Sequence, residues 1–516
     1  MVLKEVPNHL TALVNLLISY MNKTYATALT TILLLIVGSM YFNKNKNENS
    51  RSQIRVAINL ELVSFPIDPL HNPTLSNAFY TNHLYSNLID VDNNNIYIPD
   101  LASAFYWDQN KLIFDFPVKT NKSAIDAKDA EFSIRRSIFN ELNDHADLWQ
   151  AICDINESKE NCITRIYEKN GQLIIEIQNE EMKSLIVPIL ASINYKIIPQ
   201  IAFNSTDYKA AKIVDFSKTS GHYFLKPDTN NVLYATEKTL STFPNAPAEL
   251  ILINSNPNQI LSDISKHDID VISTTIPITE PIFNELAQLK WNTFNTFPIS
   301  IGLLVFSQKA LKKTTVEDRF HVGSLIRKVL EKNKIFSSEE TPEFLQYFGE
   351  GNLTDEQKAM VTSLRNTDYK KALPHLRLGI GTPAKWKSLH EAEKNIELIQ
   401  LTKSANTLPE KDKPDLYLLS NDVSFDVSFS LFSFAVKNSL LSLENNTPVE
   451  LVEKFISHKT NEKRVSFINS IHFDSIKNCR IYPIWSSPYF TAARANIVMN
   501  LSKFNSRTLM WKLETN

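Results

Sequence analysis

The pattern of apolar and polar residues predicts a series of short strands along the chain. Residues 53–60 alternate between apolar and polar positions, and residues 111–116 do so again. Because successive side chains of a strand point to opposite faces, a period of two is typical of a strand with one buried face. Residues 299–306 and 415–419 are almost uninterrupted apolar runs. Such runs predict strands that are buried on both faces.

Helical patterns lie between these strands. Residues 125–134 begin with the acidic turn typical of a helix N-terminus, and residues 316–330 and 461–471 are also predicted to be helical. Strands that alternate with helices are typical of the α/β class, so we predict an α/β fold. At 516 residues the chain is longer than one hydrophobic core usually serves, and we expect at least two lobes.

Composition argues against several classes of function. The net charge is -2 at pH 7, whereas nucleic-acid-binding proteins usually present a basic face. The sequence has no phosphate-binding loop, dinucleotide fingerprint or zinc-finger spacing, so we expect no cofactor and no metal site. It also lacks a recognisable set of nucleophile, histidine and acid, so we expect no enzyme. His222 is a lone histidine beside Gly221, where a structural role in a turn is the usual one.

An uncharged segment at residues 25–42 predicts a transmembrane helix. At about 1.5 Å per residue it reaches roughly 27 Å, enough to cross the hydrocarbon core of a bilayer. A short N-terminal segment, residues 1–24, precedes it, and a polar tether, residues 43–52, follows it. A cleaved signal peptide is the alternative. Because bulky residues follow Gly38-Ser39, the small-residue cleavage pattern is poorly formed, and we favour an uncleaved signal anchor.

The order of elements between Phe79 and Arg136 carries a family resemblance. In order, these elements are a segment ending in an apolar pair (82–90), an acidic turn (91–95), the motif Tyr97-Ile-Pro-Asp-Leu-Ala102, the aromatic run Ala104-Phe-Tyr-Trp107, a strand (111–116) and a capped helix start (125–134). This order resembles the N-terminal lobe of family 5 of the bacterial extracellular solute-binding proteins, the peptide/nickel type that supplies ABC importers. Lys218-Thr-Ser-Gly-His-Tyr223 and Ile481-Tyr-Pro-Ile-Trp485 are similar to two further motifs of that family.

The resemblance implies an architecture. It is the two-lobed periplasmic-binding-protein fold of type II, with the extra subdomain of the peptide-binding cluster, behind the N-terminal transmembrane helix. Lobe I would comprise residues 53–299 plus 479–516, and lobe II residues 300–478. Basic residues after the span favour a cytoplasmic position for the bulk of the chain by the positive-inside rule. The resemblance implies the opposite, extracytoplasmic position, and we follow the resemblance.

Asparagine occupies positions where the family has glycine. The chain has only 9 glycines, where average usage would give about 36. Asn87 and Asn93-Asn94 stand at glycine positions of the family pattern. Asparagine is one of the few other residues that tolerates positive φ, so it can replace glycine at these turns. Drift driven by genome composition is the alternative explanation.

The resemblance also indicates where a ligand binds. Glu61 follows the first strand, whose exit borders the ligand cleft in the family; a solvated strand end is the alternative for this residue. Tyr489 follows the return strand near the hinge. In peptide-binding relatives the strand at 415–419 leads to an aromatic residue and an aspartate that pairs with the α-amino group of the peptide. The residues nearest in register are Ser424, Phe425 and Asp426, with Asp422 as the alternative, and the tryptophan of the family is absent here.

Two of the three cysteines are disulfide candidates. Cys153 and Cys162 bracket a hydrophilic loop, and an oxidising compartment would let them pair. Cys479 remains unpaired in an apolar context.

We therefore expect a membrane-anchored substrate-binding protein of an ABC-type importer, held in the bacterial inner membrane by residues 25–42. It would capture an oligopeptide or a similar solute by hinge closure between the lobes and pass it to ABC permease subunits. The alternative is a degenerate binding-protein fold that acts as a membrane-bound sensor or assembly partner without transport, which the scarcity of glycine and the absent tryptophan favour.

Overall fold

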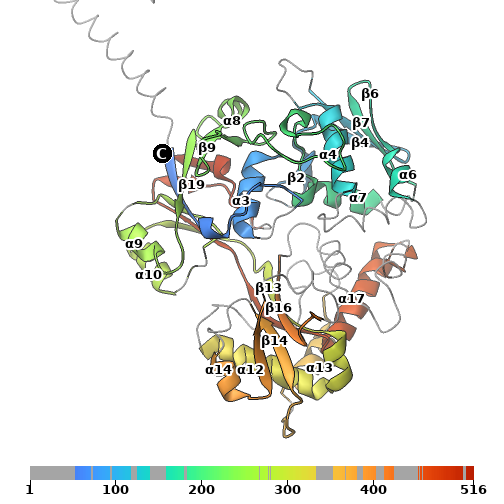
Figure 1. Cartoon of the computed structure of the whole chain (residues 1–516), viewed down its shortest axis with the longest axis vertical. Helices are drawn as coiled ribbons and strands as arrows, with labels where there is room; N and C mark the ends of the chain where they lie inside the picture. Colours follow the sequence, from blue (N-terminus) through green and yellow to red (C-terminus); the bar gives the residue numbers. More distant parts are fainter. Residues whose placement is uncertain are drawn as a thin grey trace, which may run out of the picture. The chain divides into compact units, whose positions relative to one another are not determined.

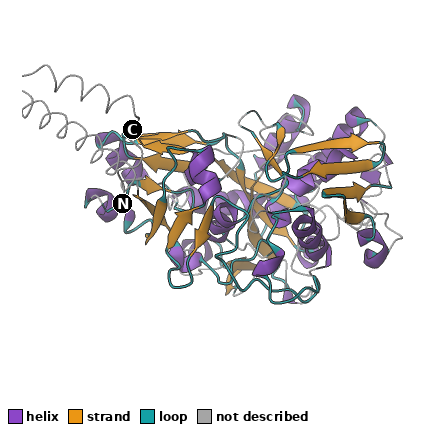
Figure 2. Ribbon diagram, turned by 90° about the horizontal axis from the view of Figure 1, so that it is seen from above, coloured by secondary structure: helices purple, strands orange, loops and turns teal. Residues whose placement is uncertain are grey.

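The computed structural model describes most of the chain after the tether. The described residues are 53–70, 74–92, 94, 96–117, 125–139, 158–178, 183–266, 268–276, 278, 280–332, 352–366, 368–380, 387–401, 412–422, 451, 454–455, 457–458, 460–503 and 507–515. Strands and helices alternate through these residues, and helices pack beside the sheets (Figure 2). The predicted α/β class is therefore confirmed.

A seven-stranded sheet contains the first strand of the described chain. Its strands are β1 (Gln53–Ile58), β8 (Tyr223–Leu225), β9 (Val232–Ala235), β10 (Glu249–Asn254), β11 (Val271–Ile272), β12 (Asn292–Asn295) and β18 (Phe490–Ala493), in the order β12-β18-β11-β1-β10-β9-β8. β1 is parallel to β11, and β18 is antiparallel to both β11 and β12. Consequently β1, β11 and β12 end at the edge of the sheet where β18 begins.

A five-stranded sheet follows in the chain. Its strands are β13 (Ser300–Phe306), β14 (Leu376–Ile380), β15 (Ile396–Gln400), β16 (Leu416–Asp422) and β17 (Ile481–Ser487), in the order β15-β14-β16-β13-β17. Figure 1 shows β13, β14 and β16 side by side. Every residue of β13 is buried, which confirms the prediction from its continuous apolar run. β13 contains Gly302, where a Cβ atom would lie only 2.0 Å from the ring of Trp485.

Smaller sheets complete the β structure. A four-stranded sheet has the order β4-β5-β7-β6, and β2 pairs with β3 and β19 with β20. The bounds are β2 (Ile89–Val91), β3 (Tyr97–Pro99), β4 (Ala104–Asp108), β5 (Lys111–Asp115), β6 (Ile166–Lys169), β7 (Gln172–Glu176), β19 (Ile497–Met499) and β20 (Leu513–Thr515). The β6–β7 hairpin turns through Asn170 and Gly171, with φ angles of 55° and 80°, as a tight hairpin turn of this kind requires.

The helices include the three that the sequence predicted. The α-helices are α3 (Leu75–Leu84), α4 (Ala127–Phe139), α6 (Lys159–Ile163), α7 (Lys183–Ala191), α8 (Glu237–Thr242), α9 (Ile260–Ser265), α10 (Glu280–Gln288), α11 (Gln308–Lys313), α12 (Val316–Lys332), α13 (Asp355–Arg365), α14 (Lys387–Ala392) and α17 (Asn461–Lys477). Short 3-10 turns are η1 (Leu60–Leu62), η3 (Ile193–Tyr195), η4 (Gln200–Ala202) and η8 (Met510–Lys512). The predicted helices at 125–134, 316–330 and 461–471 correspond to α4, α12 and α17.

The register of β17 moves one expected boundary. Residues 481–487 were expected in lobe I, but β17 pairs with β13 of the five-stranded sheet from Ile481 to Ser487. The next strand, β18, belongs to the seven-stranded sheet. The chain therefore crosses between the sheets after Ser487 rather than before residue 479.

Asn87 does not replace glycine in the expected way. Among the described non-glycine residues, positive φ occurs at Gln109, Asn170, Lys290 and Cys479, and Asn87 is not one of them. Its side-chain amide instead donates to the carbonyls of Leu190 at 3.0 Å and Ser192 at 2.7 Å. The asparagine is buried and ties the segment after α3 to the end of α7, which glycine could not do.

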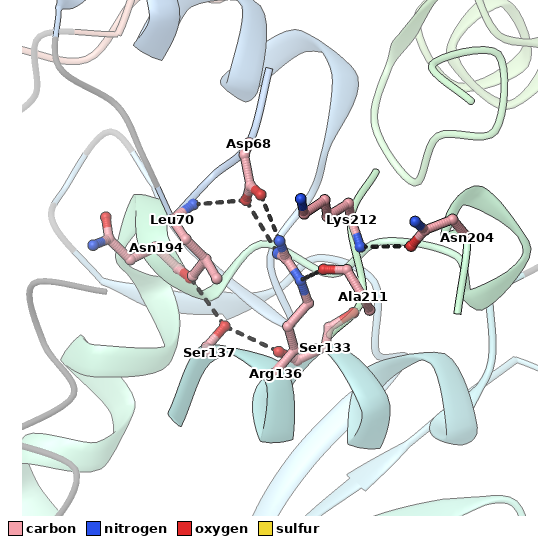
Figure 3. A network of polar contacts seen from close by, with 9 residues as sticks. All are labelled: Asp68, Leu70, Ser133, Arg136, Ser137, Asn194, Asn204, Ala211 and Lys212. Atoms are coloured by element: carbon pink, nitrogen blue, oxygen red, sulfur yellow. Dashed lines mark hydrogen bonds and ion pairs between the residues drawn. The ribbon is translucent and has the colours of Figure 1, made fainter. Parts of the chain in front are cut away.

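A buried ion pair fixes the loop after β1 onto α4 (Figure 3). The guanidinium of Arg136 donates from Nη1 to Oδ1 of Asp68 at 3.1 Å and from Nη2 to the other carboxylate oxygen. Its Nε donates to the carbonyl of Ala211 at 3.0 Å, and the guanidinium lies over the ring of Phe203. Asp68 also accepts from the backbone N–H of Leu70. Three segments far apart in sequence are held together by this one arginine.

The N-terminal predictions fall outside the described residues. Residues 1–24, 25–42 and 43–52 are not described, so the transmembrane helix and the tether stay predictions. Within the part of the chain that is described, no helix has both the length and the apolar character needed to cross a bilayer.

Candidate functional site

Three strand ends meet at one edge of the five-stranded sheet. Ser300, the first residue of β13, is paired on one side with Asp422 at the end of β16. On its other side it is paired with Ser487 at the end of β17. We call this the crossing edge, because the chain enters the sheet at Ser300 from β12 and leaves it at Ser487 for β18. Polar groups at strand ends beside a change of sheet are where open α/β folds usually bind ligands.

Tyr489 lies on the segment that leaves the crossing edge. Its backbone N–H donates to Oγ1 of Thr296 at 2.8 Å. The backbone N–H of Thr296 in turn donates to the carbonyl of Tyr489 at 3.0 Å. These reciprocal bonds join the two segments that connect the sheets. The side chain of Tyr489 is half-buried, so part of it can be covered by a ligand.

The central candidates lie outside the described residues. These are Ser424, Phe425 and Asp426, which follow β16. β16 itself confirms the predicted strand at 415–419 and ends at Asp422, the alternative candidate. The structure thus brings the strand that leads to these residues to the same edge as Tyr489. It does not describe the side chains that would complete the site.

Glu61 lies at the corresponding edge of the seven-stranded sheet. It is in the exposed turn η1, directly after β1. Because β1 ends where β18 begins, Glu61 and Tyr489 lie at the same edge of that sheet. No hydrogen bond or ion pair of the Glu61 carboxylate is found with other described residues. This exposed position fits both a cleft residue and a solvated strand end, so the role of Glu61 in binding stays a prediction.

A network of hydroxyl groups at this edge was not predicted from the sequence. Thr508 Oγ1 accepts from the backbone N–H of Thr274 at 3.2 Å and also contacts the hydroxyls of Thr274 and Thr491. Ser273 and Thr275 share a hydroxyl contact of 2.7 Å directly after β11. The signal in the sequence was the run of three hydroxyl residues Ser273-Thr-Thr275. The link to Thr508 depends on the fold and could not be inferred.

Charged groups are buried close to this network. Arg507, next to Thr508, forms an ion pair of 2.8 Å with Asp90. Burial would raise the pKa of Asp90, but Arg507 and Lys196 outweigh burial and hold that pKa at about 2. Burial, aided by Arg507, lowers the pKa of Lys196 to about 7. Burial also raises the pKa of Asp100. These charges lie inside the lobe, where they balance one another.

His222 has a structural role, as its isolation in the sequence indicated. Its ring stacks on Trp511 with centroids 4.0 Å apart, and its Nδ1 lies 3.1 Å from Oγ1 of Thr239. The neighbouring Gly221 is required by the packing, since a Cβ there would lie 2.5 Å from the carbonyl oxygen of His83. Burial lowers the pKa of His222 to about 3, so the ring is neutral at physiological pH. We assign it no chemistry.

The disulfide candidate is half described. Cys162 is buried near the end of α6 and is disulfide-bonded, whereas Cys153 lies outside the described residues, so Cys153 as its partner stays a prediction. Cys479 is buried and is a free cysteine, and burial raises the pKa of its thiol to about 12. A thiol with so high a pKa is not a reactive nucleophile. Among the described residues, no group of three or more metal-ligating side chains is found.

Several solved binding proteins have a similar fold. The murein tripeptide binding protein MppA of Escherichia coli matches with a TM-score of 0.67 at 12% identity, over 90% of this chain and 98% of that chain. Haemophilus influenzae OppA, solved in complex with RPPGFSPFR, matches with a TM-score of 0.65 at 14% identity, over 90% and 99% of the two chains. NikA from Brucella suis, solved with Fe(III)-EDTA, has a TM-score of 0.65 at 14% identity, over 90% and 100%.

The chain has the fold of the two-lobed periplasmic binding proteins. These matched structures are solute-binding proteins of family 5, which confirms at the level of fold the resemblance found in the sequence. No protein-family model matches the sequence, and no curated protein matches it.

Proposed function

We propose that the chain is a substrate-binding protein of an ABC-type importer, which captures an oligopeptide or a similar solute between its lobes. The observation that supports this most is the crossing edge. Three strand ends of the five-stranded sheet meet there, and Tyr489 lies on the segment that leaves it, in a fold whose solved examples include a protein bound to the peptide RPPGFSPFR. Exposed carboxylate, hydroxyl and aromatic groups are suited to hold a solute by hydrogen bonds and contact area.

Capture requires closure of one lobe on the other. Two connections carry the chain between the sheets near the crossing edge, and Thr296 and Tyr489 are bonded to each other there. Closure around such connections is a common way in which binding proteins sequester a ligand. Binding without covalent chemistry also agrees with the neutral His222 and the high pKa of the Cys479 thiol. We propose a binding protein and not an enzyme.

The roles of the candidate residues follow from their charge. We propose that Asp426 receives a cationic group of the solute, with Asp422 as the alternative, and that Glu61 adds negative charge from the opposite lobe. Ser424 would donate a hydrogen bond, and Phe425 and Tyr489 would provide apolar contact. A carboxylate that meets a cation in a desolvated site gains most when its other oxygen is also hydrogen-bonded.

We propose that residues 25–42 anchor the protein in the bacterial inner membrane, with the bulk of the chain extracytoplasmic, and that ABC permease subunits receive the solute. Alkaline extraction of membranes tests the anchor: the full chain should stay with the membrane, and a variant that begins at residue 50 should not. Release of the full chain would contradict the proposed membrane anchor. It would not bear on the proposed solute site.

A thermal-shift panel tests ligand capture. A ligand at 100 times its dissociation constant stabilises the folded protein by about 2.7 kcal/mol, which corresponds to several degrees in melting temperature. We expect at least one member of a library of di- to nonapeptides to produce such a shift, and Asp426→Asn to reduce it. Lys266→Met, which changes an exposed charge at the C-cap of α9, is the control. If no peptide, amino acid or metal complex shifts the wild type, the degenerate sensor or assembly partner becomes the better account.

A further inference from the structure

A pocket lies at the end of the seven-stranded sheet where β10 begins. It has a volume of about 550 Å³. One wall of the pocket is formed by residues 242–246, which lie between the end of α8 and the start of β10. β10 ends beside the end of β1, where the N–H of Ser255 donates to the carbonyl of Ile58. Residues that precede β10 therefore lie at the other edge, so this pocket is separate from the proposed solute site.

The pocket has an apolar floor and rim. Trp511 and Phe243 line it, and Trp511 is held in place by stacking on His222 and by an edge contact with His83. Ile98, which also lines it, is an aliphatic side chain that is 39% exposed. Val498, paired with the pocket residue Glu514, is 38% exposed. Exposed aliphatic side chains around an aromatic floor are typical of a surface that covers an apolar group.

Lys512 is the cation in the wall of the pocket. It lines the pocket and is partly buried, yet its ammonium forms no hydrogen bond or ion pair with the described residues. An ammonium has three donors, and a buried one is stabilised by an acceptor. Burial lowers the pKa of Lys512, as expected for a cation without a direct counter-ion. An anionic ligand group beside Lys512 would supply the missing acceptor.

The acids of the pocket limit the charge of that ligand. The Asp92 carboxylate already accepts hydrogen bonds within its own turn, from the backbone N–H groups of Asn94 and Ile96 at 2.8 Å each. Glu514 is exposed and accepts only a single hydrogen bond among the described residues, from Asn500 at 3.1 Å. It is free to accept from a cationic ligand group. With two carboxylates and one ammonium in the wall, a dianion such as phosphate would be repelled, whereas a zwitterion would be balanced.

We propose that this pocket binds a zwitterionic amino acid with a large apolar side chain. Its carboxylate pairs with Lys512, its ammonium pairs with Glu514, and its side chain covers Phe243, Trp511 and Ile98. The site goes beyond the proposed transport function and does not depend on it. An amino acid bound there would stabilise lobe I whether or not a solute occupies the crossing edge.

Isothermal titration of the full chain in detergent with L-phenylalanine tests the proposal. Lys512→Met and Glu514→Gln should each weaken binding at least about tenfold, since each removes one charge-assisted contact. Lys266→Met and Tyr489→Ala should bind as the wild type does, the second because it alters only the proposed solute site. L-phenylalaninamide, which lacks the carboxylate, should also bind at least about tenfold more weakly.

Three results would overturn the proposal. The first is no detectable binding of L-phenylalanine at concentrations up to about 10 mM, since a ligand this small is expected to bind only weakly. The second is equal binding of the amide and the amino acid. The third is loss of binding in Tyr489→Ala with retention in Glu514→Gln, which would place the amino acid at the crossing edge. Glu514→Gln alters an exposed side chain, so it keeps the test valid if Lys512→Met does not fold.

Discussion

Replacement of Arg136 by methionine should strongly destabilise lobe I. The arginine is 3% exposed. Its guanidinium makes two bonds to Asp68 and one to the carbonyl of Ala211. Methionine keeps much of the length and apolar contact of the side chain but removes all three bonds. The Asp68 carboxylate, whose side chain is 16% exposed, would retain the N–H of Leu70 as its hydrogen-bond donor.

The size of the effect follows from the burial of the pair. Removal of one partner of a buried ion pair usually costs about 3–5 kcal/mol, because the other charge stays buried without compensation. For bodies of a few hundred residues, about 1 kcal/mol corresponds to roughly 2 °C in melting temperature. We therefore expect Arg136→Met to lower the melting temperature of lobe I by about 6–10 °C. Lys128→Met, which removes an exposed positive charge from the same helix, should change it by less than about 1 °C.

The assay is differential scanning calorimetry of wild type, Arg136→Met, Asp68→Leu and the double variant. A double variant has no unpaired buried charge, so it should be more stable than either single variant, and the cycle should give a coupling of about 2 kcal/mol or more. A loss below about 1 kcal/mol in Arg136→Met, or a double variant no more stable than the singles, would refute the reasoning.

Three further predictions concern packing, pH and the cysteines. Gly221→Ala should destabilise the chain by about 1–3 kcal/mol in urea unfolding, because the new Cβ would meet backbone atoms of α3 and the residue after it; a neutral result would contradict the packing described. Burial lowers the pKa of His83 to about 4, below its ordinary value of 6.5. Its contribution is therefore complete above pH 6.5 and is lost as the pH falls toward 4. Melting temperatures should fall over that window and the slope should be smaller in His83→Phe, whereas equal slopes would exclude His83. Cys162→Ser should cost about 3 kcal/mol and expose one more alkylatable thiol, that of Cys153, if the two pair as predicted; a fall in the thiol count from three to two in the unfolded, unreduced protein would reject the disulfide.

Local patterns in the sequence predicted much of the fold. β13 could be predicted because its apolar run must be buried on both faces, and α4 because an acidic turn precedes its apolar face. The register of β17 could not, because an apolar strand such as Ile481–Ser487 fits either sheet and its partner is about 180 residues away in the sequence. Asn87 shows the same limit, since its role depends on carbonyls at the end of α7.

The candidate site was predictable to a similar extent. The positions of Glu61 and Tyr489 after their strands followed from the sequence, and the fold brings both to one edge. The bonds between Thr508 and Thr274 could not be predicted, because they join segments that meet only in the folded chain. The pocket at Lys512 is formed by three segments remote in sequence, and no local motif signals it.

The most direct test of the account is native mass spectrometry of the full chain, purified in mild detergent from a bacterial host, followed by titration with whatever solute is released. We expect a peptide or similar small solute bound in a 1:1 complex. Denaturation should release the solute. Asp426→Asn and Tyr489→Ala should each bind it at least about tenfold more weakly. A chain that carries no solute and binds none, or a solute whose affinity is unchanged in both variants, would contradict it.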